Sequence, residues 1–274
     1  MKRVVLFVKN SPKARNTAED LLKTLKGHVS CIKRIFNQRG VERKANLKGY
    51  DLMIVVGGDG TFLAGARIAS KFGIPLVGVN EGRFGFLTEI TKEEAPEVLK
   101  DILNGKVKRQ KRMMISVSLY RNSIRKFLGN FLNDVVVTKS SIARIMEIEV
   151  LAGRDSVVHV YGDGVIVSTP TGSTAYALSA GGPIIYPDSE NLLFVPICPH
   201  TLSNRPVVLP STFPVRIKIL SADRESFLTM DGQKGMYLLS GDEIEVKKSK
   251  RFCEIYLHPK KSFFEILREK LRWG

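Results

Sequence analysis

The sequence predicts two domains, a parallel α/β domain followed by a mostly β domain. Three observations support this prediction. A chain of 274 residues with 43% hydrophobic content is long enough to build two cores. Up to Gly105, apolar strand-like runs alternate with helix-like segments, as a parallel sheet requires. After Gly105, stretches with a period of two replace the helical spacing, which is typical of strands.

The first domain is expected to repeat a strand followed by a helix. Asn16 and Glu19 have the spacing of a capping box, and the helix that they begin stops at Gly27. The apolar run of residues 52–56 is typical of a strand buried on both faces. We therefore expect a Rossmann-like parallel sheet with strands over 3–9, 52–56 and 76–79 and helices over 16–26, 61–72 and 93–104.

The second domain is expected to be a β-sandwich-like or barrel-like array. Residues 115–119 and 217–220 alternate apolar and polar side chains. Turn signals divide the region into short strands at Asp155-Ser156, Gly162-Asp163-Gly164, Asp231-Gly232 and Gly241-Asp242. These patterns place the domains at 1–105 and 106–258. They are followed by a tail over 259–274, which contains a short helix that can pack back on the first domain.

Charge and cysteine content limit the classes of function. The chain has 43 Lys and Arg residues against 27 Asp and Glu, and its formal charge of +16 favours anionic partners. Because the basic residues are dispersed, we interpret them as solvated surface and keep nucleic-acid binding only as a minor alternative. Cys31, Cys198 and Cys253 are far apart and odd in number, which indicates a reducing compartment rather than disulfides or zinc.

Membrane segments are not expected. The apolar run near the N-terminus is too short for the hydrophobic region of a signal peptide and has no small-residue cleavage site. No run of 18 uninterrupted apolar residues occurs in the sequence. The sequence therefore predicts a soluble cytoplasmic protein with no membrane partner.

A glycine-rich turn is the first candidate site. Gly57-Gly58-Asp59-Gly60-Thr61 follows the strand over 52–56, and the carboxyl ends of parallel strands are where α/β sheets place ligands. Glycines let backbone N–H groups approach phosphate oxygens, and the helix that follows presents its positive end to the same anion. The carboxylate of Asp59 has two roles open to it: accepting a proton from an attacking hydroxyl, or positioning Mg²⁺.

Each candidate site residue also has a simpler interpretation as part of a turn or loop. An isolated Asp-Gly pair is most often a turn, but the double glycine, the buried strand and the helix favour a site at Asp59. On spacing alone, Asn133-Asp134 is a loop that enters a strand, and Asp163 is a hairpin residue. The chain has no G-x-x-x-x-G-K-[ST], no G-x-G-x-x-G and no H-R-D with D-F-G, which excludes P-loop enzymes and protein kinases.

The order of the motifs resembles the ATP-dependent NAD kinase family. The glycine-rich turn alone is weakly specific, since lipid kinases and phosphofructokinases share its theme, whereas the Ser, Thr and Gly segment of residues 168–176 is much more specific. The resemblance spans most of the chain and rests on residues 57–61, 133–134, 162–164, 168–176, 178–183, 199–206 and 231–233. It implies two domains with the active site between them, which agrees with the change of pattern near Gly105.

The resemblance also implies roles for individual residues. Asp59 is expected to accept the proton of the adenosine ribose 2′-hydroxyl of NAD as the γ-phosphoryl group of ATP is transferred. Tyr176 offers a flat ring for a base to stack on, although Tyr176 and Leu178 can also be core residues behind a Ser/Thr-rich turn. The implied contacts with NAD or ATP are Gly57, Gly58, Asp59, Gly60, Thr61, Phe62, Asn133, Asp134, Arg144, Tyr161, Asp163, Thr171, Thr174, Ala175, Tyr176, Ala177, Leu178, Ser179 and Gln233.

Cofactors and partners follow from the same resemblance. It implies a divalent ion, with Mg²⁺ the expected one and no protein residue assigned as its ligand. ATP or polyphosphate is the expected phosphoryl donor, and the expected assembly is a homodimer or homotetramer. A lipid kinase of the diacylglycerol or sphingosine type is the leading alternative, but the polar segment of residues 169–179 suits a dinucleotide better.

Overall fold

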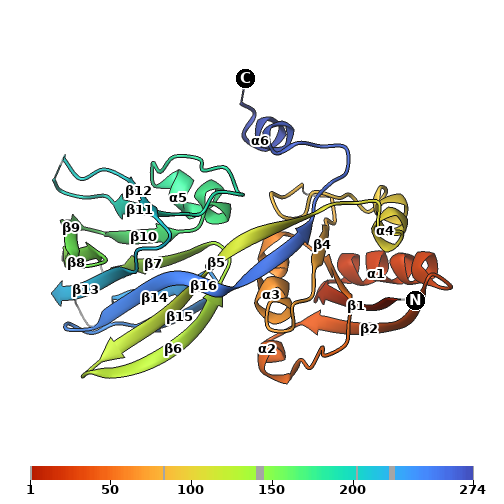
Figure 1. Cartoon of the computed structure of the whole chain (residues 1–274), viewed down its shortest axis with the longest axis horizontal. Helices are drawn as coiled ribbons and strands as arrows, with labels where there is room; N and C mark the ends of the chain where they lie inside the picture. The colour runs from red at the N-terminus through yellow and green to blue at the C-terminus, as the bar shows by residue number, and fades with distance from the viewer. Residues whose placement is uncertain (1, 83, 140–144, 202, 222–225, 274) are drawn as a thin grey trace. The chain divides into compact units, whose positions relative to one another are not determined.

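The computed structural model describes residues 2–82, 84–139, 145–201, 203–221 and 226–273 (Figure 1). The chain divides into two compact units. The first unit combines Met1–Lys111 with Phe252–Gly274, and the second unit is Arg112–Arg251. The sequence analysis had placed its boundary after Gly105, close to the start of the first strand of the β-rich region.

The first unit is a three-layer α/β structure. Its strands pair in parallel in the order β2-β1-β3-β4. Ile255, near the C-terminal end of β16 (Glu243–Tyr256), pairs with Leu76 of β4. Helices α1 and α4 pack on one face of the sheet, and α3 packs on the other face, where its Gly65 lies against Phe7, Met53 and Val55. The elements of the unit are β1 (Lys2–Lys9), α1 (Pro12–Leu25), β2 (Val29–Asn37), α2 (Val41–Lys44), β3 (Leu52–Val56), α3 (Asp59–Ala69), β4 (Leu76–Val79), α4 (Ala95–Leu103) and α6 (Phe263–Leu271).

Two helices of this unit begin earlier than the sequence analysis expected. Helix α1 starts at Pro12, because Ser11 accepts a hydrogen bond from the N–H of Ala14 and proline suits the first turn. The expected capping box at Asn16 is therefore wrong. Helix α3 starts at Asp59 rather than at Thr61, which places the expected catalytic carboxylate inside the first helical turn.

The turn that leads into helix α4, whose N-cap residue is Glu94, is closed by a capping-box pattern of hydrogen bonds that was not predicted. The N–H and hydroxyl of Thr91 donate to the Glu94 carboxylate at 2.9 and 2.8 Å, and the Glu94 N–H donates to the Thr91 hydroxyl at 3.2 Å. The Ala95 N–H also bonds the Thr91 carbonyl at 2.9 Å. Thr91 is thus the residue that organises the start of this helix.

The second unit is an antiparallel β-sandwich. One sheet has the strand order β12-β11-β10-β7-β14-β15, and the other contains β16, β13, β8 and β9 with the β5–β6 hairpin joined to β16. Side chains from both sheets form one core that includes Phe131, Val137, Phe194 and Ile217. Its elements are β5 (Arg109–Arg121), β6 (Ile124–Phe131), β7 (Asp134–Thr138), β8 (Met146–Ala152), β9 (Asp155–Gly162), β10 (Gly164–Ser168), η1 (Thr171–Thr174), α5 (Tyr176–Ser179), β11 (Asn191–Ile197), β12 (Val207–Pro210), β13 (Val215–Ser221), β14 (Phe227–Met230), β15 (Lys234–Tyr237) and β16 (Glu243–Tyr256).

The expected fold class, a parallel α/β domain with a sandwich-like β domain, is confirmed. One expected turn is wrong: Asp155 and Ser156 already belong to β9, and the turn lies just before them at Gly153, whose φ of +64° suits glycine. In the part of the chain that the structure describes, no helix has the length and apolar character needed to span a membrane.

Candidate active site

The glycine-rich turn connects β3 to α3 in the first unit. Gly57 has a φ of +154°, its N–H donates to the carbonyl of Val79 at 2.9 Å, and a Cβ atom there would lie 2.7 Å from the Thr61 hydroxyl oxygen. Only glycine fits this position without strain. Gly58 is the N-cap of α3 and Asp59 is its first residue. The turn therefore places a carboxylate at the positive end of a helix dipole.

The carboxylate of Asp59 is held by the backbone of residues 86–88. The N–H groups of Phe86, Leu87 and Thr88 and the hydroxyl of Thr88 donate to it over distances of 2.9 to 3.1 Å. Hydrogen bonds to a charged acceptor are among the stronger ones in proteins. The side chain of Asp59 is thus fixed in orientation while it remains partly exposed.

Other residues of the turn differ in what they can offer a ligand. Gly58 and Gly60 are exposed, so a ligand can reach their backbone. Thr61 is buried, and Phe62 is fully buried in the core. A contact of Phe62 with ATP or NAD would therefore have to be made by its backbone, and the sequence-based prediction for Phe62 is restricted accordingly.

A pocket of about 420 Å³ lies in the second unit. It brings together four of the residues expected to contact NAD, which come from two segments far apart in the sequence: Asn133 and Asp134 at the start of β7, and Ala175 and Tyr176 at the start of α5. Its full lining is Asn133, Asp134, Val136, Thr138, Ala175, Tyr176, Thr229, Asp231 and Gly232.

Two carboxylates lie in this pocket. Asp134 is 5% exposed and Asp231 is 4% exposed. Burial and the neighbouring charge of Asp231 raise the pKa of Asp134 from 3.8 to about 7. Asp231 is held in place because its carboxylate accepts the N–H groups of Leu132 and Asn133 at 3.3 and 2.8 Å. The pocket therefore offers two carboxyl groups, of which that of Asp134 titrates near neutral pH.

Two buried polar atoms, one on the pocket-lining Asn133 and one on Thr171 of the Ser, Thr and Gly segment, are left unsatisfied. In the described part of the chain, neither Oδ1 of Asn133 nor the hydroxyl oxygen of Thr171 has a hydrogen-bond partner. Buried polar atoms are almost always paired in a folded protein, so such exceptions call for a missing partner. Both atoms are suited to hydrogen bonds with ribose or phosphate groups of a ligand.

The Ser, Thr and Gly segment packs directly against Asn133. The N–H of Thr169 donates to the Asn133 carbonyl oxygen at 2.8 Å, and a Cβ atom on Gly172 would lie 2.4 Å from that oxygen. Ser173 is fully buried, and its hydroxyl bonds the backbone of Pro170 and Ile185. Some hydroxyls of the segment therefore shape the loop rather than meet a ligand.

The ends of this segment differ in exposure. Tyr176 is 45% exposed and lines the pocket, which leaves its ring accessible to a base, whereas Ala177 is fully buried. Thr174 and Leu178 are half-buried, and Ser179 is exposed. The alternative that Tyr176 is a core residue is wrong.

Tyr161, Asp163 and Gln233 are not among the residues that line the pocket. Tyr161 on β9 donates its hydroxyl to Glu147 at 2.9 Å, and this bond raises the pKa of Tyr161. Asp163 forms an ion pair with Lys139 at 2.7 Å. Gln233 is exposed in the turn that follows Gly232. Arg144 lies outside the described residues, so its expected contact stays a prediction.

Asp231 is the site residue that the sequence analysis missed. The resemblance includes Asp231-Gly232-Gln233 but implies a contact only for Gln233, and an Asp-Gly pair by itself is common in hairpin turns. The signal was its position directly after β14, the strand that pairs with β7 next to Asp134. Its φ of +50° is unusual for a residue other than glycine, but a single sequence does not reveal backbone angles.

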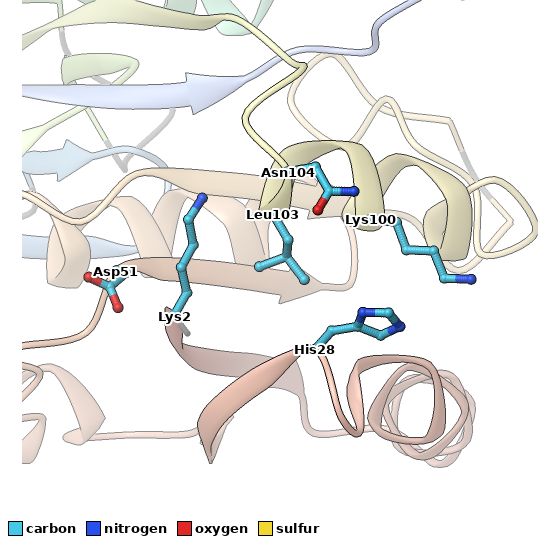
Figure 2. A pocket seen from close by; sticks show the side chains of 6 residues that line it. All are labelled: Lys2, His28, Asp51, Lys100, Leu103 and Asn104. Carbon is cyan, nitrogen blue, oxygen red and sulfur yellow. The ribbon is translucent and has the colours of Figure 1, made fainter.

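A second hollow, of about 380 Å³, occurs in the first unit (Figure 2). Lys2, His28 and Lys100 contribute positive or titratable groups to it. Part of its lining already has internal partners, since Lys2 donates to the Ile102 carbonyl at 3.2 Å and Asp51 accepts the Arg3 N–H at 2.7 Å. We assign this hollow no part in the chemistry.

The side chains of the site bear on whether the protein itself can hold a metal ion. Among the described residues, no group of three or more His, Cys, Asp or Glu side chains gathers in a way that could hold a metal ion. The Asp59 carboxylate already accepts four hydrogen bonds from N–H and O–H donors. The described side chains therefore do not fit a resident metal held by the protein alone.

Fold and site together define a class of protein: a phosphotransferase with a carboxylate in a glycine-rich turn and a polar pocket in a β-rich unit. Comparison with known families narrows this class. Residues 4–107 match the model of the ATP-NAD kinase N-terminal domain, and residues 132–257 match that of the ATP-NAD kinase C-terminal domain. The chain belongs to the NAD kinase family, which confirms the resemblance read from the sequence.

Individual relatives agree with this assignment. The chain is 58% identical over 274 residues to the NAD kinase of Aquifex aeolicus, covering 100% of both chains. It is 38% identical over 282 residues to the NAD kinase of Geobacter sulfurreducens, covering 100% of this chain and 99% of that relative. Family membership makes the chain an ATP-dependent phosphotransferase.

Solved structures support the fold. An NAD kinase from Archaeoglobus fulgidus in complex with ATP has a TM-score of 0.77 and 26% identity, and the match covers 98% of both chains. Yeast NADH kinase complexed with NADH has a TM-score of 0.87 over 100% of this chain and 88% of that one. Its identity is 24%, so this likeness shows the fold alone.

Proposed function

We propose that the chain transfers the γ-phosphoryl group of ATP to the adenosine ribose 2′-hydroxyl of NAD, with Asp59 as the proton acceptor. Family membership supports the proposed reaction, and one structural observation supports the proposed role of Asp59. Its carboxylate is held at the carboxyl end of β3 by the backbone of residues 86–88 and is partly exposed. A general base must be fixed in orientation and reachable by the substrate at the same time.

The proposed step is a single displacement. The O–H bond of the 2′-hydroxyl breaks and its proton moves to the Asp59 carboxylate. The 2′-oxygen forms a bond to the γ-phosphorus, and the bond from that phosphorus to the bridging oxygen breaks, so that the electron pair leaves on ADP. Exposed backbone at Gly58 and Gly60, together with the start of α3, suits the negative charge of the phosphates.

The second unit is proposed to bind the dinucleotide. Asn133 Oδ1 and the Thr171 hydroxyl are buried without partners, and ribose hydroxyls or phosphate-linked groups would satisfy them. Asp134 and Asp231 are suited to accept hydrogen bonds from ribose hydroxyls, and the exposed ring of Tyr176 is suited to stacking on a base. A lipid tail would gain nothing from two buried carboxylates, which disfavours the lipid-kinase alternative.

The divalent ion is proposed to enter with the nucleotide as Mg·ATP. Mg²⁺ is commonly bound through substrate phosphates with few protein ligands, which agrees with the absence of a metal-binding cluster among the described residues. When bound, the ion neutralises charge on the phosphates. Location in the cytoplasm and assembly as a homodimer or homotetramer complete the proposal, and light scattering of the purified protein tests the assembly.

The test is a coupled assay with NAD, ATP and Mg²⁺ in which an NADP-specific dehydrogenase reports the product. Asp59→Asn should fold, bind NAD and lose turnover by about 10² to 10⁴, the range typical of a general base. Asp20→Asn is the matched control, because its exposed carboxylate contacts only Lys23 in the same unit. Turnover of Asp59→Asn at the parent rate would remove Asp59 from this role.

A further inference from the structure

The hydrogen bonds to Asp59 are distributed unequally over its two oxygens. Oδ1 accepts three bonds, from the N–H groups of Leu87 and Thr88 at 3.0 and 3.1 Å and from the Thr88 hydroxyl at 3.0 Å. Oδ2 accepts one bond, from the N–H of Phe86 at 2.9 Å. Each carboxylate oxygen has about two lone-pair sites. Oδ1 is therefore saturated, and Oδ2 keeps one lone pair for another donor.

We propose that residues 86–88 form a cradle that sets Asp59 for proton transfer, with Oδ2 as the accepting atom and Thr88 as the positioning residue. This inference rests on the proposed role of Asp59. While the cradle holds Oδ1, a substrate hydroxyl has only Oδ2 to approach. The proton of that hydroxyl moves to Oδ2, and the electron pair of its O–H bond stays on the oxygen that attacks phosphorus.

The cradle is packed so closely around the Asp59 carboxylate that two positions beside it have no space for a side chain. A Cβ atom on Gly85 would lie 2.1 Å from Asp59 Oδ1 and 2.4 Å from the Thr88 hydroxyl oxygen. On the other side, a Cβ atom on Gly78 of β4 would lie 2.4 Å from the Leu87 carbonyl oxygen. Two glycines therefore permit the segment to pass between the sheet and the Asp59 carboxylate.

Thr88 is itself anchored from behind. It is fully buried, and its carbonyl oxygen accepts the side-chain amide of buried Asn80 at 3.1 Å. The other atom of that amide, Oδ1, accepts the Gly82 N–H at 2.9 Å. Because the Asn80 side chain is committed at both ends, the hydroxyl of Thr88 points at Asp59 from a fixed support.

The other end of the segment is anchored by the C-terminal residues. The Lys270 side chain in α6 donates to the carbonyl oxygen of Phe84, and the Lys261 ammonium lies 4.5 Å from the centre of the Phe84 ring. Phe84 directly precedes Gly85. The cradle is thus held on both sides of the residues that meet Asp59.

The test compares Thr88→Val with Thr88→Ser. Valine keeps the shape and removes the hydroxyl, whereas serine restores it. Losing one hydrogen bond to a charged group should lower kcat on the order of 10- to 100-fold, with KM for NAD and for ATP unchanged and with serine recovering most of the rate. Thr17→Val is the control, because it removes a buried hydroxyl that bonds only its own helix.

Gly85→Ala provides a second test that removes no hydrogen-bonding group. Its methyl carbon would overlap Asp59 Oδ1, so kcat should fall while NAD binding and the thermal transition of the protein persist. Parent kcat in both Thr88→Val and Gly85→Ala, together with an inactive Asp59→Asn, would overturn the cradle and leave the proposed function standing. An active Asp59→Asn would overturn the proposed function first.

Discussion

The backbone N–H of Asp231 donates a 3.0 Å hydrogen bond to the carbonyl oxygen of Asp134. This bond fixes the start of β7 to the end of β14, where both carboxyl side chains are buried. Burial first, and the charge of Asp231 second, raise the pKa of Asp134 to about 7. The folded protein consequently holds a proton in a pH range where an unfolded aspartate has lost it.

The pH dependence of stability should report this proton. Since the pKa of Asp134 rises from 3.8 to about 7 on folding, its contribution to stability is fully present below pH 3.8 and is lost as pH rises through 7. Asp134→Asn removes the titration. Between pH 5 and pH 8 the variant should gain on the order of 2 kcal/mol relative to the parent, as measured by urea denaturation.

A matched substitution separates this effect from general changes in charge. Asp155→Asn alters an exposed aspartate of the same unit and should follow the parent at both pH values. Equal differences between parent and Asp134→Asn at pH 5 and pH 8 would show that Asp134 does not titrate in this range.

Tyr176 should affect binding of NAD rather than turnover. Its ring is 45% exposed at the pocket, so Tyr176→Ala should leave the fold intact and raise KM for NAD by about tenfold, the loss of one base-stacking contact. Tyr176→Phe keeps the ring and should keep KM. Phe213→Ala, which removes another ring that is 45% exposed, serves as the control. An unchanged KM in Tyr176→Ala would exclude stacking.

Glu94 should stabilise the first unit when its carboxylate is ionised and should lose this effect in acid. Burial raises the pKa of Glu94, but its hydrogen bonds with Thr91 and its contact with His258 outweigh burial and hold the pKa below 4.5. Its contribution is therefore present above pH 4.5 and is lost as pH falls through the folded pKa. Glu94→Gln should cost about 1 kcal/mol at pH 7 and less at pH 3, measured by urea denaturation.

The neighbouring Glu93 supplies the comparison for that measurement. Its side chain is 69% exposed and pairs with Lys92 at 3.5 Å. Glu93→Gln should change stability very little at either pH, because exposed ion pairs contribute little. A loss in Glu94→Gln that stays constant down to pH 3 would count against an ionised Glu94 in the capping box.

Much of the fold could be predicted from the sequence because the hydrophobic periodicity and the turn residues indicate the same elements. The apolar run of β3 reads as a strand buried on both faces, and all five of its residues are buried. Strand β2 was not predicted, because Val29–Asn37 mixes charged and apolar residues, as suits its position at the edge of the sheet. Helix starts were the weakest point, since Ser11 and Thr91 cap through contacts that compete with other polar residues nearby.

The candidate site was predictable only where its residues are adjacent in the sequence. The glycine-rich turn could be identified as a short motif, whereas Asn133-Asp134 could be identified only through the family resemblance. The cradle around Asp59 could not, because its donors are mostly backbone N–H groups, which every residue except proline carries. Asp231 was missed for a related reason, since its pairing with Asp134 depends on which strands become neighbours.

The division of the chain between the two units sets the order in which the units can be completed during synthesis. The second unit, Arg112–Arg251, is continuous, whereas the first also requires Phe252–Gly274. A nascent chain leaves the ribosome N-terminus first, and domains generally fold as units during synthesis. The sandwich can therefore fold on the ribosome, while the segment that carries Lys261 and Lys270 reaches Phe84 only after the second unit has been synthesised. Residues that are synthesised after the second unit therefore complete the surroundings of Asp59.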